Sequence, residues 1–239
     1  MNWLQEPIVG FDTETTGTDV WNDRIVSASL VSITGGEERK SKQWIINPGV
    51  EIPEGAIAVH GITNEVARSQ GQAPAEALEE ITGILATVLG AGRPVVVFNA
   101  SFDLTLLEVE NHRHKVPSLA SRLGGDIAPI LDPLVIDKHV DRFRKGKRLL
   151  SKVADHYGVE LTDAHDAHAD ACAAAELVPK ILDRFPDLSV LSPRELHASQ
   201  VSWRAEQQTS LCEYFERIGN LEAAASISKA WPLERVSDS

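Results

Sequence analysis

The chain has 239 residues, of which 43% are hydrophobic and 24% charged, a composition typical of soluble globular proteins. It shows no apolar run of the ~18–20 residues that span a bilayer, no signal-peptide pattern, and too few cysteines for a disulfide framework or a cysteine-based zinc site. We therefore expect a cytoplasmic protein with Cys172 and Cys212 reduced. The net charge of −12 argues against a general nucleic-acid-binding surface, although a basic island from Lys138 to Arg148 is where a phosphate backbone is expected to touch.

The N-terminal part of the sequence has patterns typical of β-strands. Apolar and β-branched residues over 7–13, 24–33 and 43–46 predict three strands, and Gly35-Gly36 predicts a hairpin turn between the second and the third. Because a hairpin joins strands of opposite direction, the sheet is expected to start antiparallel.

Helices and shorter strands alternate in the middle of the chain. Apolar residues at helical spacing predict a helix over 75–89, followed by a buried parallel strand over 94–98 and a helix over 102–111. The segment 127–136 is interpreted as a short strand, and helices are expected over 149–157 and 167–182. This alternation predicts an α/β fold.

A boundary is expected near residue 186, with an α/β domain over 1–186 and a helical extension over 187–239. Ser192-Pro193-Arg194-Glu195 resembles a capping box with proline at the first helical position, and it predicts a long helix that ends near Ile218. A shorter helix from Leu221 to about Ala230 would complete a helical hairpin.

The first predicted strand ends in two carboxylates. Asp12 and Glu14 lie two residues apart in Ile8-Val9-Gly10-Phe11-Asp12-Thr13-Glu14-Thr15-Thr16-Gly17, and side chains at positions i and i+2 of a strand share a face. Because burying charge is costly, a cation is expected beside them, and a divalent ion is the simplest candidate. The alternative is a surface strand end with two solvated acids.

Two later clusters supply further acids. Asp103 follows the buried strand in Asn99-Ala100-Ser101-Phe102-Asp103, and Asp170 ends His165-Asp166-Ala167-His168-Ala169-Asp170. Together the four carboxylates could form an oxygen-only site, which suits Mg²⁺ or Mn²⁺ rather than zinc. Taken alone, Asp103 is explained equally well as an acid in the first turn of a helix.

Asp166 is the expected N-cap of the 167–182 helix, because aspartate is a preferred residue at that position. This assignment puts His165 just outside the helix, on a loop, and Asp170 one turn inside. His168 is nearer to Asp170 in the sequence, but it is expected on the helix as a surface or packing residue.

In this order the motifs resemble the DEDDh exonucleases, a ribonuclease-H-like family that includes the proofreading epsilon subunit of bacterial DNA polymerase III. The resemblance runs from about Pro7 to Leu182. It rests on Phe11-Asp12-Thr13-Glu14-Thr15-Thr16-Gly17, on Asn99-Ala100-Ser101-Phe102-Asp103, on His165 five positions before Asp170, and on Val59-His60-Gly61-Ile62-Thr63. Phe98 departs from the pattern, since many members carry histidine there. Which of Asp132 and Asp137 matches a further family aspartate stays open.

The resemblance implies a ribonuclease-H-like mixed sheet flanked by helices, and a 3′–5′ exonuclease that releases 5′-mononucleotides from single-stranded nucleic acid, DNA in the first place. It implies two divalent ions, Mg²⁺ or Mn²⁺, one held by Asp12, Glu14 and Asp170 and the other by Asp12 with Asp103. His165 would take the proton from the attacking water. The residues expected to hold the terminal nucleotide are Thr15, Thr16, His60, Asn99 and Phe102.

Other functions remain compatible with these residues. An exonuclease of the same family could act on RNA, and a non-catalytic module on the same fold could bind nucleic acid. An HD-type phosphohydrolase, indicated by His165-Asp166 and His168, is disfavoured by the β-rich N-terminal part. The C-terminal helices could serve self-association or contact with a polymerase, and no membrane partner is expected.

Overall fold

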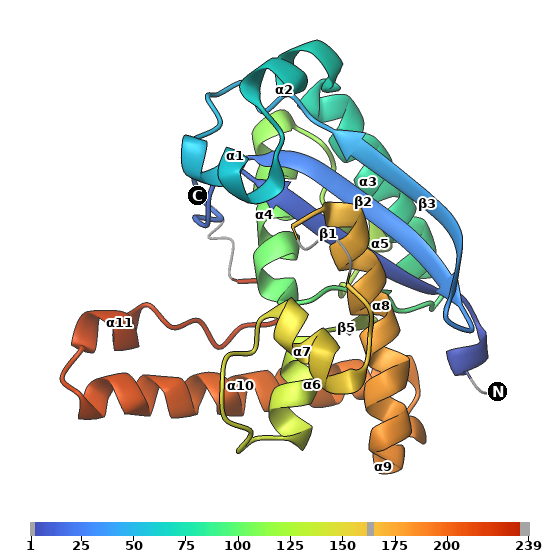
Figure 1. Cartoon of the computed structure of the whole chain (residues 1–239), viewed down its shortest axis with the longest axis vertical. Helices are drawn as coiled ribbons and strands as arrows, with labels where there is room; N and C mark the ends of the chain where they lie inside the picture. The colour runs from blue at the N-terminus through green and yellow to red at the C-terminus, as the bar shows by residue number, and fades with distance from the viewer. Residues whose placement is uncertain (1–2, 162–164, 235–239) are drawn as a thin grey trace.

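A mixed sheet of five strands, in the order β3–β2–β1–β4–β5, forms the centre of the structure, a computed structural model that describes residues 3–161 and 165–234 (Figure 1). Strands β1 to β3 pair antiparallel, whereas β4 and β5 run parallel to β1. The strands are β1 (Ile8–Thr15), β2 (Ile25–Thr34), β3 (Glu37–Ile45), β4 (Val95–Val96) and β5 (Ile130–Leu131). The expected α/β class and antiparallel start are confirmed.

The turn between β2 and β3 is made by Gly35 and Gly36, with φ of 62° and 81°, which glycine adopts without strain. The third strand starts at Glu37 and not, as expected, at Gln43. Its first half carries polar, exposed side chains such as Ser41 and Lys42, because β3 is an edge strand. An exposed edge needs no apolar residues, so this half of the strand left no hydrophobic signal.

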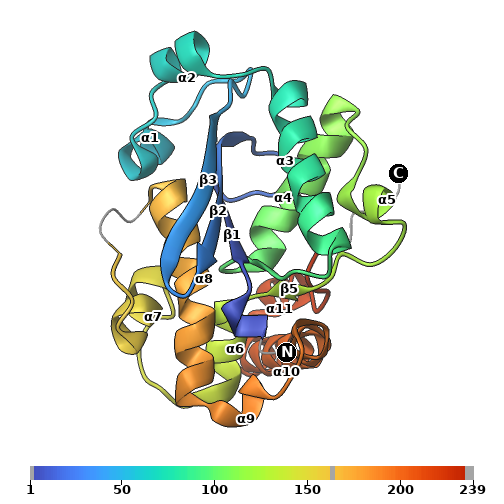
Figure 2. The same cartoon turned by 90° about the vertical axis from the view of Figure 1, so that its right-hand side faces the viewer.

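Helices cover both faces of the sheet (Figure 2). The helices α3 (Pro74–Gly90) and α4 (Ala100–His114) pack on one face, where Phe11 of β1 is fully buried. The helix α8 (Ala167–Arg184) packs on the other face against Ile8. Because successive side chains of a strand point to opposite faces, β1 contributes to both cores.

The helix α8 lies unusually close to β1. The alanines at 171, 173, 174 and 175 are buried, and their short side chains allow the helix to approach the strand closely. A Cβ at Gly10 would overlap the carbonyl oxygen of Ala171. This close approach determines how far the first turn of α8 lies from the acidic end of β1.

The segment expected to be one short strand over 127–136 divides into two elements. Strand β5 covers only two residues, and α6 (Pro133–Val140) starts directly after Asp132. The Asp132 carboxylate caps this helix by accepting a hydrogen bond of 2.9 Å from the Leu134 amide. The strand prediction was wrong over 133–136 because Asp-Pro is a helix start and the following apolar residues pack as a buried helix.

The predicted helix over 149–157 is present as α7 (Leu150–Tyr157). Further short helices, which were not predicted, complete the fold: η1 (Trp3–Gln5), α1 (Glu54–His60), α2 (Asn64–Gln70), α5 (Leu119–Leu123) and α9 (Pro186–Ser189). No helix within the described ranges is long and apolar enough to cross a membrane. Cys172 and Cys212 form no disulfide.

The C-terminal segment packs against the body of the molecule. The helix α10 (Pro193–Arg217) begins with the predicted capping box and contacts α6 and β5, and α11 (Leu221–Ala225) folds back on it. The helix α11 ends before Ser226, earlier than expected, and serines at 226 and 228 disfavour its continuation. The boundary between 1–186 and 187–239 stays a prediction.

We predict that Gly10→Ala lowers the free energy of unfolding by about 1–3 kcal/mol, because the added methyl group forces α8 away from β1. Urea denaturation followed by circular dichroism measures this change. Gly83→Ala is the matched control: a Cβ there meets no atom within 4 Å, and alanine in a helix is favoured over glycine by about 0.5–1 kcal/mol. Equal effects of the two substitutions would contradict the close approach.

Candidate active site

Three acids converge where β1 ends and α8 begins. Asp12 and Glu14 project from the same face of β1, and Asp170 lies in the first turn of α8. Ligand oxygens of the three carboxylates lie within 4.8 Å of one another. Asp166 caps α8, as expected, by accepting hydrogen bonds of 3.0 Å from the amides of His168 and Ala169. The cap fixes the first turn of α8 and with it the position of Asp170.

The crowded acids disfavour one another's charge. Burial, followed by the carboxylates of Asp103 and Asp170, raises the pKa of Asp12 well above its ordinary value. Burial and the neighbouring Asp170 carboxylate raise the pKa of Glu14 to about 8. These shifts mean that the cluster is short of positive charge at neutral pH.

The donor set fits a divalent cation. The Asp170 Oδ1 atom is buried without a hydrogen-bond partner, and in the described part of the chain no lysine or arginine forms an ion pair with Asp12, Glu14 or Asp170. All donors are carboxylate oxygens, which are the ligands that Mg²⁺ and Mn²⁺ prefer. The residues present can therefore hold such an ion.

Asp103 lies beside this group and not within it. Its Oδ1 atom accepts hydrogen bonds from the Thr13 amide, at 3.1 Å, and from the Thr13 hydroxyl, at 2.6 Å. Burial raises the pKa of Asp103 to about 7 despite these bonds. The structure thus brings three of the four predicted acids together and ties the fourth to the strand that carries two of them.

The second motif is held in shape by a buried carboxylate. Asn99 adopts a left-handed conformation, with φ of 64°. The amides of Asn99 and Ala100 each donate a hydrogen bond of 3.0 Å to the two oxygens of Asp132. Burial raises the pKa of Asp132 in spite of these bonds. Sequence reasoning missed this role, although Asp132 directly before Pro133 is a helix-cap signal.

Asp137 has a different structural role. Its buried carboxylate forms ion pairs with Arg144, at 2.6 Å, and with Arg148, and it accepts a hydrogen bond of 2.9 Å from the Tyr157 hydroxyl. Two arginines of the basic island are therefore anchored inside the protein. Neither Asp132 nor Asp137 lies in the metal-binding group.

His165 lies just before α8, as the sequence predicts, while residues 162–164 of the same loop fall outside the described residues. It is exposed, has φ of 71°, and its amide donates a hydrogen bond of 3.3 Å to Asp170 Oδ2. His168 is inside the first turn of α8, again as expected. His165 is therefore next to the acids and open to solvent.

Thr15 and Thr16 shape the loop after β1. The Thr15 hydroxyl donates to the Gly17 carbonyl at 2.6 Å, and the Thr16 hydroxyl donates to Asp23 Oδ1 at 2.7 Å. Both hydroxyl hydrogens are thus used inside the protein. Any role of these residues toward a ligand would rest on the hydroxyl lone pairs and on the backbone.

His60 lies at the end of α1, with its Nδ1 accepting a hydrogen bond of 3.1 Å from the Ile62 amide. This bond places the neutral ring's proton on Nε2, a buried atom without a partner. Burial lowers the pKa of His60 although the nearby Thr15 backbone acts to raise it. A neutral ring with an unused N–H donor is suited to a hydrogen bond with a ligand.

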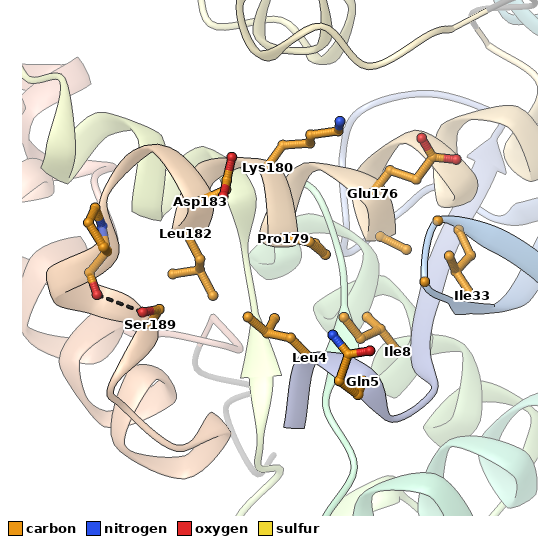
Figure 3. A pocket seen from close by; sticks show the side chains of 14 residues that line it. Leu4, Gln5, Ile8, Ile33, Glu176, Pro179, Lys180, Leu182, Asp183 and Ser189 are labelled. Atoms are coloured by element: carbon orange, nitrogen blue, oxygen red, sulfur yellow. Dashed lines mark hydrogen bonds between the residues drawn. The ribbon is translucent and has the colours of Figure 1, made fainter. Parts of the chain in front are cut away.

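Asn99 and Phe102 border a cavity of about 330 Å³ beside the second motif, which Trp21 and Arg204 also line. A separate cavity of about 670 Å³ lies at the start of β1, around Leu4 and Ile8 (Figure 3). Because Asp12 and Glu14 lie toward the other end of the strand, this second cavity is not part of the acidic site.

The chain is similar to known exonucleases in sequence and in structure. A family model described as an exonuclease (RNase_T) matches residues 9–178. The DNA polymerase III PolC-type of Caldanaerobacter subterraneus subsp. tengcongensis is 26% identical over 196 residues, which cover 82% of this chain and 13% of the polymerase. The chain therefore corresponds to a small part of that relative.

Two solved structures share the fold. E. coli exonuclease I in complex with a dT13 oligonucleotide has a TM-score of 0.66 at 19% identity, covering 77% of this chain and 42% of that chain. The zinc-bound form of an E. coli exonuclease I–ssDNA complex has a TM-score of 0.65 at 19% identity, with 77% and 42% coverage. Since the family model covers more than half of the chain and the fold agrees, this chain belongs to the exonuclease family, as a member of the DEDD type with the ribonuclease-H-like fold.

Proposed function

We propose that the protein removes 5′-mononucleotides from the 3′ end of single-stranded DNA in a reaction that depends on Mg²⁺ or Mn²⁺. The observation that carries this proposal is the convergence of Asp12, Glu14 and Asp170 within 4.8 Å, with Asp170 Oδ1 buried and unpartnered. Membership of the exonuclease family implies the use of divalent metal ions.

Asp12, Glu14 and Asp170 would hold one ion, and Asp12 with Asp103 would hold a second. Bound ions would lower the pKa of the attacking water and neutralise charge on the phosphodiester oxygens. The all-oxygen donor set favours Mg²⁺ or Mn²⁺. One exonuclease I structure is a zinc-bound form, so the metal that supports turnover has to be measured.

His165 would accept the proton of the attacking water. It is solvent-exposed beside Asp170, and histidine has an unperturbed pKa of about 6.5, near the working pH. Its loop position would allow the ring to turn toward a bound strand. Buried His60 would hold the terminal nucleotide by donating its Nε2 proton, and Thr15, Thr16, Asn99 and Phe102 are the other proposed contacts.

DNA is proposed over RNA because the similar exonuclease I structure contains a dT13 oligonucleotide. A contact that reads the 2′-hydroxyl would decide the matter, and the exonuclease of the same fold acting on RNA is the second candidate. A cytoplasmic location and a polymerase partner or self-association through α10 and α11 remain predictions. The PolC-type relative is what supports a polymerase setting.

Whether the substrate is DNA or RNA is tested with 3′-labelled DNA and RNA oligonucleotides of the same base sequence. We expect release of labelled mononucleotides from DNA at a higher kcat/KM than from RNA, complete loss with chelator, and recovery on addition of Mg²⁺ or Mn²⁺. Activity that survives chelation would contradict metal dependence. Strand binding without hydrolysis would favour a non-catalytic module instead.

His165→Ala should lower kcat by about 10²–10⁴-fold, because removal of a general base costs about that much. His168→Ala is the control, since His168 lies within the first turn of α8. Single-turnover rates with Mg²⁺ compare the two variants. A large loss in His168→Ala, with His165→Ala near wild type, would show that the base was assigned to the wrong histidine.

Asp12→Asn should abolish activity and stabilise the metal-free protein at pH 8, because it removes a buried charge that lies beside other carboxylates. The folded pKa values of Asp12 and Glu14 are raised above their unfolded values, so the unfolded chain releases these protons at lower pH than the folded protein does. The stability cost is therefore absent below about pH 4, grows as the pH rises toward the folded pKa, which is about 8 for Glu14, and is constant above it. The gain from Asp12→Asn should follow the same course.

Urea unfolding in chelator measures this stability gain. Asp155→Asn, which removes an acid paired with Lys152 on the surface, is the matched control and should change little. If Asp12→Asn destabilises the metal-free protein at every pH, repulsion among the acids is not the dominant energy at this site.

A further inference from the structure

The C-terminal helix places an arginine beside the second motif. Arg204 of α10 donates a hydrogen bond of 3.3 Å from Nη2 to the Ser101 hydroxyl. It lines the cavity of about 330 Å³ together with Asn99, Phe102 and Trp21. Arg204 lies outside the segment 9–178 that the exonuclease family model matches. This cation therefore comes from a part of the chain that the family model does not match.

Arg204 has unused hydrogen-bonding capacity. Its Nε atom is buried without an acceptor. Asp132 and Glu234 act on Arg204 through space, but none of the described carboxylates forms an ion pair with it, and burial lowers its pKa. A half-buried guanidinium with an unused N–H donor is suited to bind an anion from outside the protein by donating hydrogen bonds to it.

A second cation lies next to Arg204. Lys138 lies on α6, which packs against the helix α10 that carries Arg204. Burial, followed by the Arg204 charge, lowers the pKa of Lys138, while the carboxylate of Asp132 acts to raise it. Among the described residues the Lys138 ammonium has no hydrogen bond and no ion pair. Two neighbouring positive charges that form no ion pair with the described residues repel each other, and an anion bound near both would relieve that repulsion.

Lys138 also lines a groove of about 510 Å³, which lies between α6, the loop that follows it, and α10. Arg142 adds a third cation there, while Trp203 and Tyr214 of α10 add aromatic rings. The ten-residue step from Arg204 to Tyr214 spans about 15 Å of helix. The helix α10 thus lines both hollows, with Arg204 in the cavity beside the second motif and residues from Trp203 to Tyr214 in the groove.

We propose that Arg204, Lys138 and Arg142 form a track that binds the phosphates of the substrate strand on the 5′ side of the nucleotide being removed. The inference rests on the proposed function. A nucleic-acid strand fits better than an acidic peptide, because the track starts at Asn99 and Phe102 and combines cations with rings on which bases can stack. The cations are concentrated here in a chain of net charge −12.

The test compares a long and a minimal substrate. The p-nitrophenyl ester of thymidine 5′-monophosphate occupies only the terminal position, whereas dT13 reaches along the track. In Arg204→Gln with Lys138→Gln, the ratio of kcat/KM for dT13 to kcat/KM for the ester should fall about tenfold. The dependence of dT13 affinity on salt should weaken by a log–log slope of about 1 per lost cation.

Matched variants separate charge from structure. Lys180→Gln removes the same charge on the far part of α8, beside the other cavity, and should leave the ratio at its wild-type value. Arg204→Lys keeps the charge and should recover most of the ratio. Equal losses on both substrates would overturn the track, because they would show that Arg204 and Lys138 only position the second motif.

An unchanged ratio with an unchanged salt slope would also overturn the inference. Failure of the proposed function looks different: the wild-type protein would then hydrolyse neither substrate. In that case fluorescence anisotropy of labelled dT13 still tests the track, because binding should weaken in the double variant and not in Lys180→Gln.

Discussion

Repulsion among three carboxylates within 4.8 Å is the constraint on which the rest of this structure depends. Burial, followed by the neighbouring carboxylates, raises the pKa values of Asp12 and Glu14, so the fold and not the site itself must hold the acids together. The sheet does this from one side, since β1 is paired along its length with β2 and near its start with β4. The alanine-rich face of α8 does it from the other, at Gly10. The stability of the core thus offsets the cost of holding these charges close together, as is common at functional sites.

Local chemistry made most of the site predictable. The apolar run before Asp12, the period of two between Asp12 and Glu14, and the cap at Asp166 each depend on residues close in sequence, and the structure has them as expected. What escaped prediction depends on tertiary contacts. The polar half of β3 is a strand because β2 pairs with it. Asp132 supports the Asn99 turn through hydrogen bonds with the amides of Asn99 and Ala100, which lie 33 and 32 positions earlier in the sequence.

Distance in sequence also explains why the contacts of the C-terminal helix were not predicted. Its apolar spacing predicted a helix but not the residues that the helix contacts. The structure buries Gln200 completely, and its side chain accepts a hydrogen bond of 2.7 Å from the Asp132 amide while donating to the Ile130 carbonyl. Arg204, one turn further, reaches the second motif itself. Such polar contacts have no period and leave no pattern in the amino-acid sequence.

The Gln200 contact limits how freely this nuclease can be recombined with other proteins. A chain that ended before α10 would expose the Asp132 amide and leave β5 as an uncovered sheet edge. Any arrangement that keeps the nuclease but exchanges its C-terminal segment must therefore supply a glutamine-like group at the same place. The helix α10 thus supports the second motif, and the exchangeable unit is longer than the segment from Asp12 to Asp170 that carries the cluster of acids.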